Sequence, residues 1–106
     1  MLYLTEQTKI LLSPTPVDFR KQIDGFVALC KNHLKQSPNS GNLFVFINKS
    51  NTMIRALSYD GTGYWLATKR LSKGHYAAWP KTDNLVHPLQ ATELIKIIKG
   101  VFAPNK

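Results

Sequence analysis

The stretch from Asn42 to Pro80 constrains the fold of this chain more than any other. It contains three apolar runs rich in β-favouring residues and separated by polar turns: Leu43 to Ile47, Met53 to Tyr59, and Tyr64 to Leu71. The Asp60-Gly61 pair between the last two runs is a strong hairpin signal, because the turn needs a positive φ that glycine adopts without steric cost. Strands joined by tight turns run antiparallel, so the stretch predicts a β-meander.

A helix is expected before the meander. Thr15-Pro16-Val17-Asp18 matches a helix start with a Thr cap, proline at the first helical position and an acid at the third. Apolar residues then recur at helical spacing, at Phe19, Ile23, Phe26, Val27, Cys30 and Leu34. The pattern predicts one long amphipathic helix that covers one face of the sheet and leaves the other face available.

Shorter elements are predicted at both ends. Lys9 to Leu12 favours a short strand, and His75 to Trp79 favours another. Leu85 to Leu89 favours an edge strand because it contains Pro88, and a short C-terminal helix is expected between Gln90 or Thr92 and Gly100. We therefore expect an α+β fold with an antiparallel sheet of about four to six strands. It should form a single domain over residues 1–106, frayed in the first few residues and at 103–106.

The chain is strongly basic. Its 106 residues include 14 Lys and Arg against 6 Asp and Glu, which gives a net charge of +8. Such a surface favours a polyanion through counterion release, so a nucleic-acid partner is favoured over a solvated basic surface with no specific partner. No basic amphipathic helix with an aromatic anchor suggests a membrane partner. The modest core, at 43% hydrophobic residues, allows for a homo-oligomer.

No apolar run is long enough to span a membrane, and the N-terminus lacks a signal-peptide pattern. The single cysteine, Cys30, rules out an internal disulfide. Together these features predict a cytoplasmic protein.

Nothing in the sequence reads as an active site. Asp18 is assigned to the helix cap and Asp60 to the turn, so a converging set of carboxylates for a two-metal nuclease is disfavoured. The histidines are dispersed, and Cys30 lies on the apolar stripe of the expected helix. We expect no catalytic residue, no metal and no cofactor.

The basic residues are the better candidates for function. Those near aromatic residues or at the helix start are candidates for phosphate contact: Arg20, Lys21, Lys49, Arg55, Lys69, Arg70 and Lys73. In a regular strand Lys69 and Arg70 point to opposite faces, so a patch at the strand ends is more plausible than one basic face. Trp65 is expected to lie in the core, whereas the sequence leaves Tyr64 and Tyr76 open between core and base stacking.

Three blocks of the sequence stand in a recognisable order. They are PVDFRK followed by IDG from Pro16, PNSG running into LFVF from Pro38, and YDGTGYWL with KRL, KG and WP from Tyr59. In this pattern the chain resembles the TnpB-type accessory protein, the second open reading frame, of IS-sixty-six class bacterial insertion sequences. The resemblance covers about Ile10 to Gly100. Val17, Phe19, Gln22 and Tyr59 depart from the family pattern.

The resemblance implies a non-catalytic accessory protein for DNA transposition, which works beside a separate transposase that carries the catalytic acids. The partners it implies are therefore DNA, the transposase of the same element, or both. The alternative is a protein-interaction module or homo-oligomeric adaptor without direct DNA contact. The motif positions that the resemblance marks are Asp18, Asp24, Gly25, Asp60, Gly61, Gly63, Leu71, Gly74, Trp79 and Pro80.

Overall fold

The computed structural model describes residue 5 and residues 7–103. Its elements follow in the order β1 (Ile10–Leu12), α1 (Ile23–Asn32), β2 (Leu43–Ile47), β3 (Met53–Tyr59), β4 (Tyr64–Arg70), β5 (His75–Tyr76), β6 (His87–Leu89), α2 (Ala91–Lys99) and β7 (Val101–Phe102). Apart from Ala103, nearly all the residues expected to be frayed lie outside the described part of the chain.

The predicted meander is confirmed in β2, β3 and β4, whose neighbours pair antiparallel. The five-stranded sheet has the order β4-β3-β2-β1-β6. The expectation of a wholly antiparallel sheet is wrong, because β1 lies parallel to β2. Parallel strands need a long crossover, and the connection that contains α1 supplies it.

The prediction of one long N-terminal helix is also wrong. Helix α1 spans only Ile23–Asn32, and its N-cap is Gln22 rather than Thr15. The segment before it is extended, because Val17 forms a parallel bridge with Asn48 and its N–H donates to the Ile47 carbonyl over 3.0 Å. This pairing with the sheet replaces the first turns of the expected helix.

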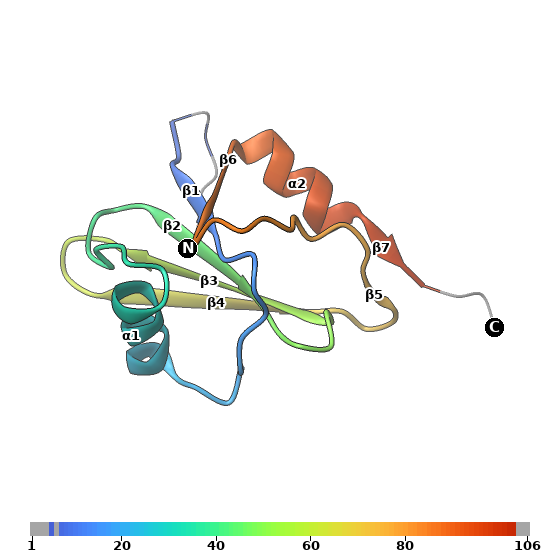
Figure 1. Ribbon diagram of the computed structural model, residues 1–106, viewed down its shortest axis with the longest axis horizontal. Helices are drawn as coiled ribbons and strands as arrows, with labels where there is room; N and C mark the ends of the chain where they lie inside the picture. Colours follow the sequence, from blue (N-terminus) through green and yellow to red (C-terminus); the bar gives the residue numbers. More distant parts are fainter. Residues whose placement is uncertain (1–4, 6, 104–106) are drawn as a thin grey trace.

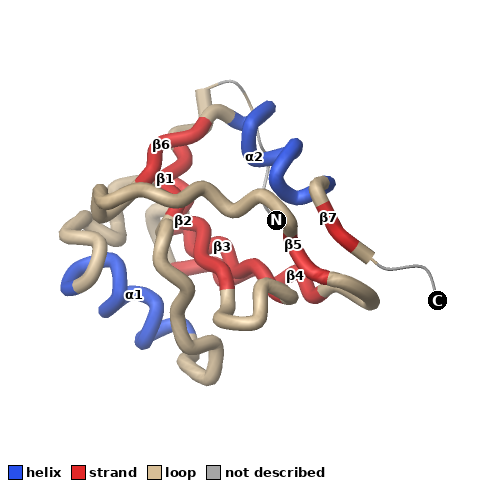
Figure 2. Tube along the Cα trace, turned by 45° about the vertical axis from the view of Figure 1, so that its right-hand side comes forward, coloured by secondary structure: helices blue, strands red, loops and turns tan. Residues whose placement is uncertain are grey.

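Both faces of the sheet are covered, contrary to the expectation of one free face (Figure 1). On the α1 face, Phe26, Cys30 and Leu34 pack with Phe44, Phe46 and Leu57. On the opposite face, Leu94 and Ile97 of α2 pack over Val45 and Ile54. The loop from β5 to β6 runs over the sheet beside α2 (Figure 2), and its Trp79 donates a hydrogen bond from Nε1 to the Ser13 carbonyl over 2.9 Å.

The C-terminal elements follow the sequence closely. Strand β6 lies at the sheet edge and holds Pro88 opposite Leu11. Helix α2 begins with a capping box between Gln90 and Glu93 and has Gly100 as its C-cap, as expected. The short strand β5 pairs with β7 in a separate two-stranded sheet, which the sequence pattern did not indicate.

Candidate nucleic-acid interface

The β3–β4 turn is built around the carboxylate of Asp60. Its Oδ1 accepts hydrogen bonds from the Thr62 and Gly63 backbone N–H groups and from the Thr62 hydroxyl, over 2.9 to 3.0 Å. Its Oδ2 accepts one from Trp65 Nε1 over 2.8 Å. These donors, the Thr62 backbone N–H first, lower the pKa of Asp60 well below its usual range. Gly61 has a φ of +99°, so the predicted Asp-Gly turn is confirmed.

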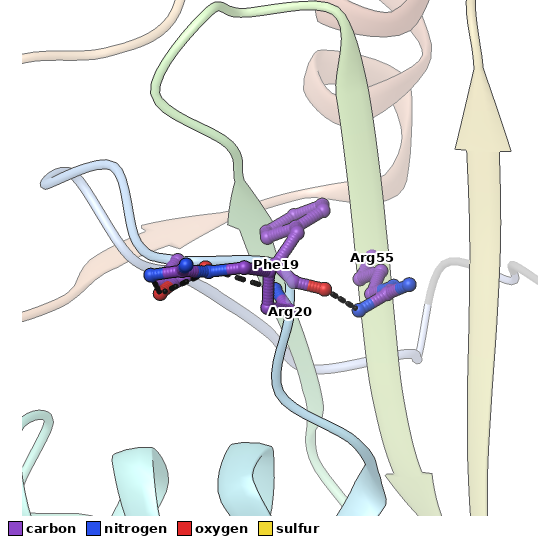
Figure 3. A network of polar contacts seen from close by, with 4 residues as sticks. Phe19, Arg20 and Arg55 are labelled. Atoms are coloured by element: carbon purple, nitrogen blue, oxygen red, sulfur yellow. Dashed lines mark hydrogen bonds and ion pairs between the residues drawn. The ribbon is translucent and has the colours of Figure 1, made fainter.

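Arg55 is used inside the molecule. Its Nη1 donates to the carbonyls of Phe19 and Lys21 over 2.7 and 3.0 Å, and its Nε donates to the Thr68 hydroxyl over 2.9 Å. Figure 3 shows the guanidinium reaching the segment that precedes α1. The same group lies 5.0 and 5.4 Å from the ring centroids of Phe19 and Phe26. Arg55 thus ties the segment before α1 to the sheet, which leaves little of its guanidinium for a phosphate.

Three of the predicted basic residues gather at the end of the β3–β4 hairpin that lies away from the Asp60 turn. Arg70 lies opposite Met53, which directly follows the β2–β3 turn that carries Lys49. Lys73 lies in the β4–β5 turn, which is held beside the β2–β3 turn by a hydrogen bond from the Leu71 N–H to the Thr52 carbonyl over 3.0 Å. All three side chains are exposed. We call Lys49, Arg70 and Lys73 the basic end.

Arg20 lies beside the basic end. With Lys49 it lines an open hollow of about 460 Å³ between the segment before α1 and the β2–β3 turn. Its guanidinium is paired with Asp18 at 2.7 Å, yet the Arg20 side chain is 91% exposed. The hydrogen bonds from Arg20 hold the pKa of the Asp18 carboxyl well below its usual range. An exposed pair of this kind adds little stability, so Arg20 remains accessible to an anion.

Lys69 and Lys21 are not among the residues that the two turns bring together. Lys69 faces Ile54 on the α2 side of the sheet, opposite to Arg70, which confirms that the two residues point to different faces. The Cβ of Lys21 lies against Gly25 of α1, so close that a methyl group at Gly25 would come within 2.7 Å of it. The structure therefore does not join all seven basic candidates in one patch.

Several positions marked by the resemblance have structural roles. Gly74 has a φ of +79°, and a side chain there would collide with the backbone of Phe102 and Ala103. Leu71 and Trp79 pack in the core of the α2 face, and the half-buried Pro80 follows Trp79. Asp24 is exposed in the first turn of α1, where a negative charge suits the helix dipole.

The structure decides the environment of two aromatic residues, Trp65 and Tyr76. Trp65 is 50% exposed, so the expectation that it lies in the core is wrong. It shares a sheet face with Lys69, and helix α2 packs over the neighbouring strands rather than over Trp65. The sequence signal for an exposed Trp65 was that strand alternation puts it on the same face as Lys69, a charged residue. Tyr76 is buried, at 1% exposure, and so belongs to the core.

The remaining polar candidates do not converge. Cys30 lies on the face of α1 that packs against the sheet and is buried there. Desolvation raises the pKa of its thiol to about 12. Across residues 5 and 7–103, no three His, Cys, Asp or Glu side chains gather where they could hold a metal ion. Within the same residues, neither helix has the length and apolar character needed to cross a membrane.

The chain is similar to one family of proteins and to individual proteins of known sequence. The family description of the IS66 Orf2-like proteins, TnpB_IS66, matches residues 8–105. Uncharacterized protein y4jC of Sinorhizobium fredii (strain NBRC 101917 / NGR234) is 37% identical over 93 residues, covering 88% of this chain and 79% of the relative. Uncharacterized protein y4hO of the same strain is 27% identical over 101 residues, covering 95% and 87%. No solved structure matches the chain.

The match extends through every element of the described fold, from β1 to β7. The three sequence blocks that carry the resemblance correspond to the segment before α1 with the first residues of that helix, to the entry to β2, and to the β3–β4 hairpin with its following turn and the start of the β5–β6 loop. The family is an accessory, second-reading-frame family and not a known enzyme family. The chain therefore belongs to the IS66 Orf2-like family and is associated with transposition of insertion sequences as an accessory protein.

Proposed function

We propose that the protein assists transposition by contacting the phosphate backbone of DNA through its basic end, with Arg20 as an adjoining contact. The observation that carries this proposal is the clustering of Lys49 and Lys73, on two neighbouring turns, with Arg70 at the end of β4, all three side chains being exposed. Flexible cations on adjacent turns can follow a phosphate backbone, and each contact releases counterions. The role belongs in the cytoplasm, where the DNA of the element lies.

The mode of contact should be largely independent of base sequence. Lysine ammonium groups act as point charges towards phosphate, whereas sequence is read by groups that reach base edges in a groove. The basic end lies on two turns and the end of a strand rather than on a protruding helix. The protein would then position or hold DNA while the separate transposase carries out the chemistry.

The test compares two triple variants that remove the same amount of charge. The first carries Lys49→Gln, Arg70→Gln and Lys73→Gln. The second carries Lys9→Gln, Lys31→Gln and Lys35→Asn. Lys9 precedes β1 and the other two lie on α1 or just after it, towards the end of the sheet that carries the Asp60 turn. Asparagine is chosen at Lys35 because that residue has a φ of 57°.

Binding of each variant to duplex DNA from the element ends is measured across a salt series. We expect the first variant to lose affinity and to reduce the slope of log K against log salt by about 0.9 for each lost phosphate contact. The second variant should keep most of both. Equal effects of the two variants would show that binding follows net charge alone. A wild-type chain that does not bind DNA at low salt, yet co-purifies with the transposase after nuclease treatment, would be a protein-interaction module instead.

A further inference from the structure

Among the residues that the structure describes, none pairs with one side of the β4 backbone. Strand β4 is the outermost strand of the five-stranded sheet, and its one partner among the described strands is β3. Five of its seven residues are exposed, including Trp65, Ala67 and Lys69 on the α2 face. An edge of this length is a template for pairing with another strand.

The hydrogen-bonding register identifies the free backbone groups. The Leu71 N–H donates to the Thr52 carbonyl, and the Asp60 N–H donates to the Gly63 carbonyl, so bonded and non-bonded pairs alternate between these two points. On this alternation Trp65, Ala67 and Lys69 direct their backbone groups towards β3. The residues whose N–H and C=O groups point outward are Tyr64, Leu66, Thr68 and Arg70.

The charge along β4 is also asymmetric. Both charges, Lys69 and Arg70, lie at its C-terminal end, and both aromatic residues, Tyr64 and Trp65, lie at its N-terminal end. A second copy of β4 aligned antiparallel about Ala67 would place Trp65 opposite Lys69 and Tyr64 opposite Arg70. Each cation would then face an aromatic ring, and no like charges would lie directly opposite.

We propose that β4 is a homodimer interface, in which two copies pair antiparallel about a two-fold axis at Ala67 and continue one sheet across both chains. In this register every outward-facing backbone group of the strand meets an outward-facing group of the second copy, which satisfies the free edge. Ala67 meets its own counterpart in a non-hydrogen-bonded pair, where the side chains come closest and a small residue fits.

The charges on β4 select this register. A shift that aligns Lys69 or Arg70 with its own counterpart places like charges directly opposite, which is destabilising. Charged residues on an edge normally prevent indiscriminate pairing. Here their position at one end of the strand allows the antiparallel arrangement centred on Ala67, which overlaps the full length of β4.

The first test is cross-linking of the full-length chain carrying Ala67→Cys. In the proposed dimer the two substituted Cα atoms lie about 4.5 Å apart, within the range that a disulfide spans. Lys69→Cys is the matched control, because its two copies would be offset by four residues, or about 13 Å. The native Cys30 is buried and gives little background. Rapid disulfide formation by Ala67→Cys alone supports the proposal, and equal rates in both variants overturn it.

The second test is a charge exchange followed by light scattering after size exclusion over a range of concentrations, in nuclease-treated protein. Wild type should shift with concentration towards twice the chain mass of 12.0 kDa. Trp65→Lys places a lysine opposite Lys69 of the second copy and should weaken dimerisation about tenfold. Adding Lys69→Glu to Trp65→Lys should restore it.

The double variant separates the interface from local folding. Trp65→Lys also removes the indole that donates to Asp60, but this loss is present in both variants, so recovery in the double variant reports the contact between copies. A wild-type chain that stays monomeric throughout the concentration range, or a double variant as weak as the single one, contradicts the proposed interface.

Discussion

At one end of the β3–β4 hairpin, the carboxylate of Asp60 accepts four hydrogen bonds from its own turn and from Trp65. At the other end, Lys49 and Lys73 are exposed on neighbouring turns, beside the exposed Arg70 at the end of β4. Both ends carry charged residues that the sequence marked. The difference shows that charge held by internal donors serves the fold, whereas charge left in solvent is available to a partner.

The same difference separates the basic residue Arg55 from the exposed basic residues of the basic end. Arg55 is a basic residue of the same hairpin, yet its guanidinium bonds Phe19, Lys21 and Thr68. Variants at each place therefore separate stability from binding, and the expected effects on stability decrease from Gly74 through Arg55 to Asp60.

The largest effect on stability is expected at Gly74, which shapes the turn that carries Lys73. In Gly74→Ala the new methyl group would collide with the Phe102 carbonyl and lie 2.9 Å from Ala103 Cα, at a φ of +79°. We expect a loss of about 3 kcal/mol in the free energy of unfolding, measured by urea denaturation. Gly41→Ala is the control, because its φ is +90° and its surroundings are open. It should cost about 1 kcal/mol. Equal costs would mean that β7 does not hold this turn.

Arg55→Met should have an intermediate effect. It keeps the apolar stem but removes the donors to the Phe19 and Lys21 carbonyls, which should lower the free energy of unfolding by about 2 kcal/mol. DNA affinity of the folded variant should change little. Arg70→Gln is the counterpart, with stability within about 0.5 kcal/mol of wild type and a lower salt slope of DNA binding. If Arg55→Met lowered the slope and left unfolding unchanged, Arg55 would belong to the interface.

The smallest effect is expected for Asp60→Asn and depends on pH. Because the folded-state pKa of Asp60 lies below the ordinary value of 3.8, its carboxylate stabilises the fold above that pH. This contribution is lost as the pH falls below 3.8 towards the folded-state pKa. Thermal unfolding at pH 7 and near pH 3 should therefore show a smaller pH dependence for the variant than for wild type. The pKa of Asp18 is lowered as well, by Arg20, so Asp18 accounts for part of the pH dependence that remains in the variant. If the variant showed the same pH dependence as wild type, the hydrogen bonds to Asp60 would not stabilise the folded protein.

The hairpin and the C-terminal helix could be predicted because their signals are local. β2 and β3 have the bounds that their apolar runs indicated, and α2 lies between its caps Gln90 and Gly100. Of the candidate site, alternation along the strand already placed Lys69 and Arg70 on opposite faces. The use of Arg55 was not predictable, since its partners at Phe19 and Lys21 lie more than thirty positions away along the chain.

By itself, the sequence determined the meander, the Asp60 turn, the basic character and the family, because these depend on residue types at short spacings. The tertiary structure decided where α1 begins, since Val17 pairs with Asn48 instead of continuing a helix. It also decided that β1 runs parallel to β2, that α2 covers the second face, and that Trp65 stays exposed on the edge. These outcomes depend on contacts between distant segments, whose free energies outweigh the local preferences of each segment.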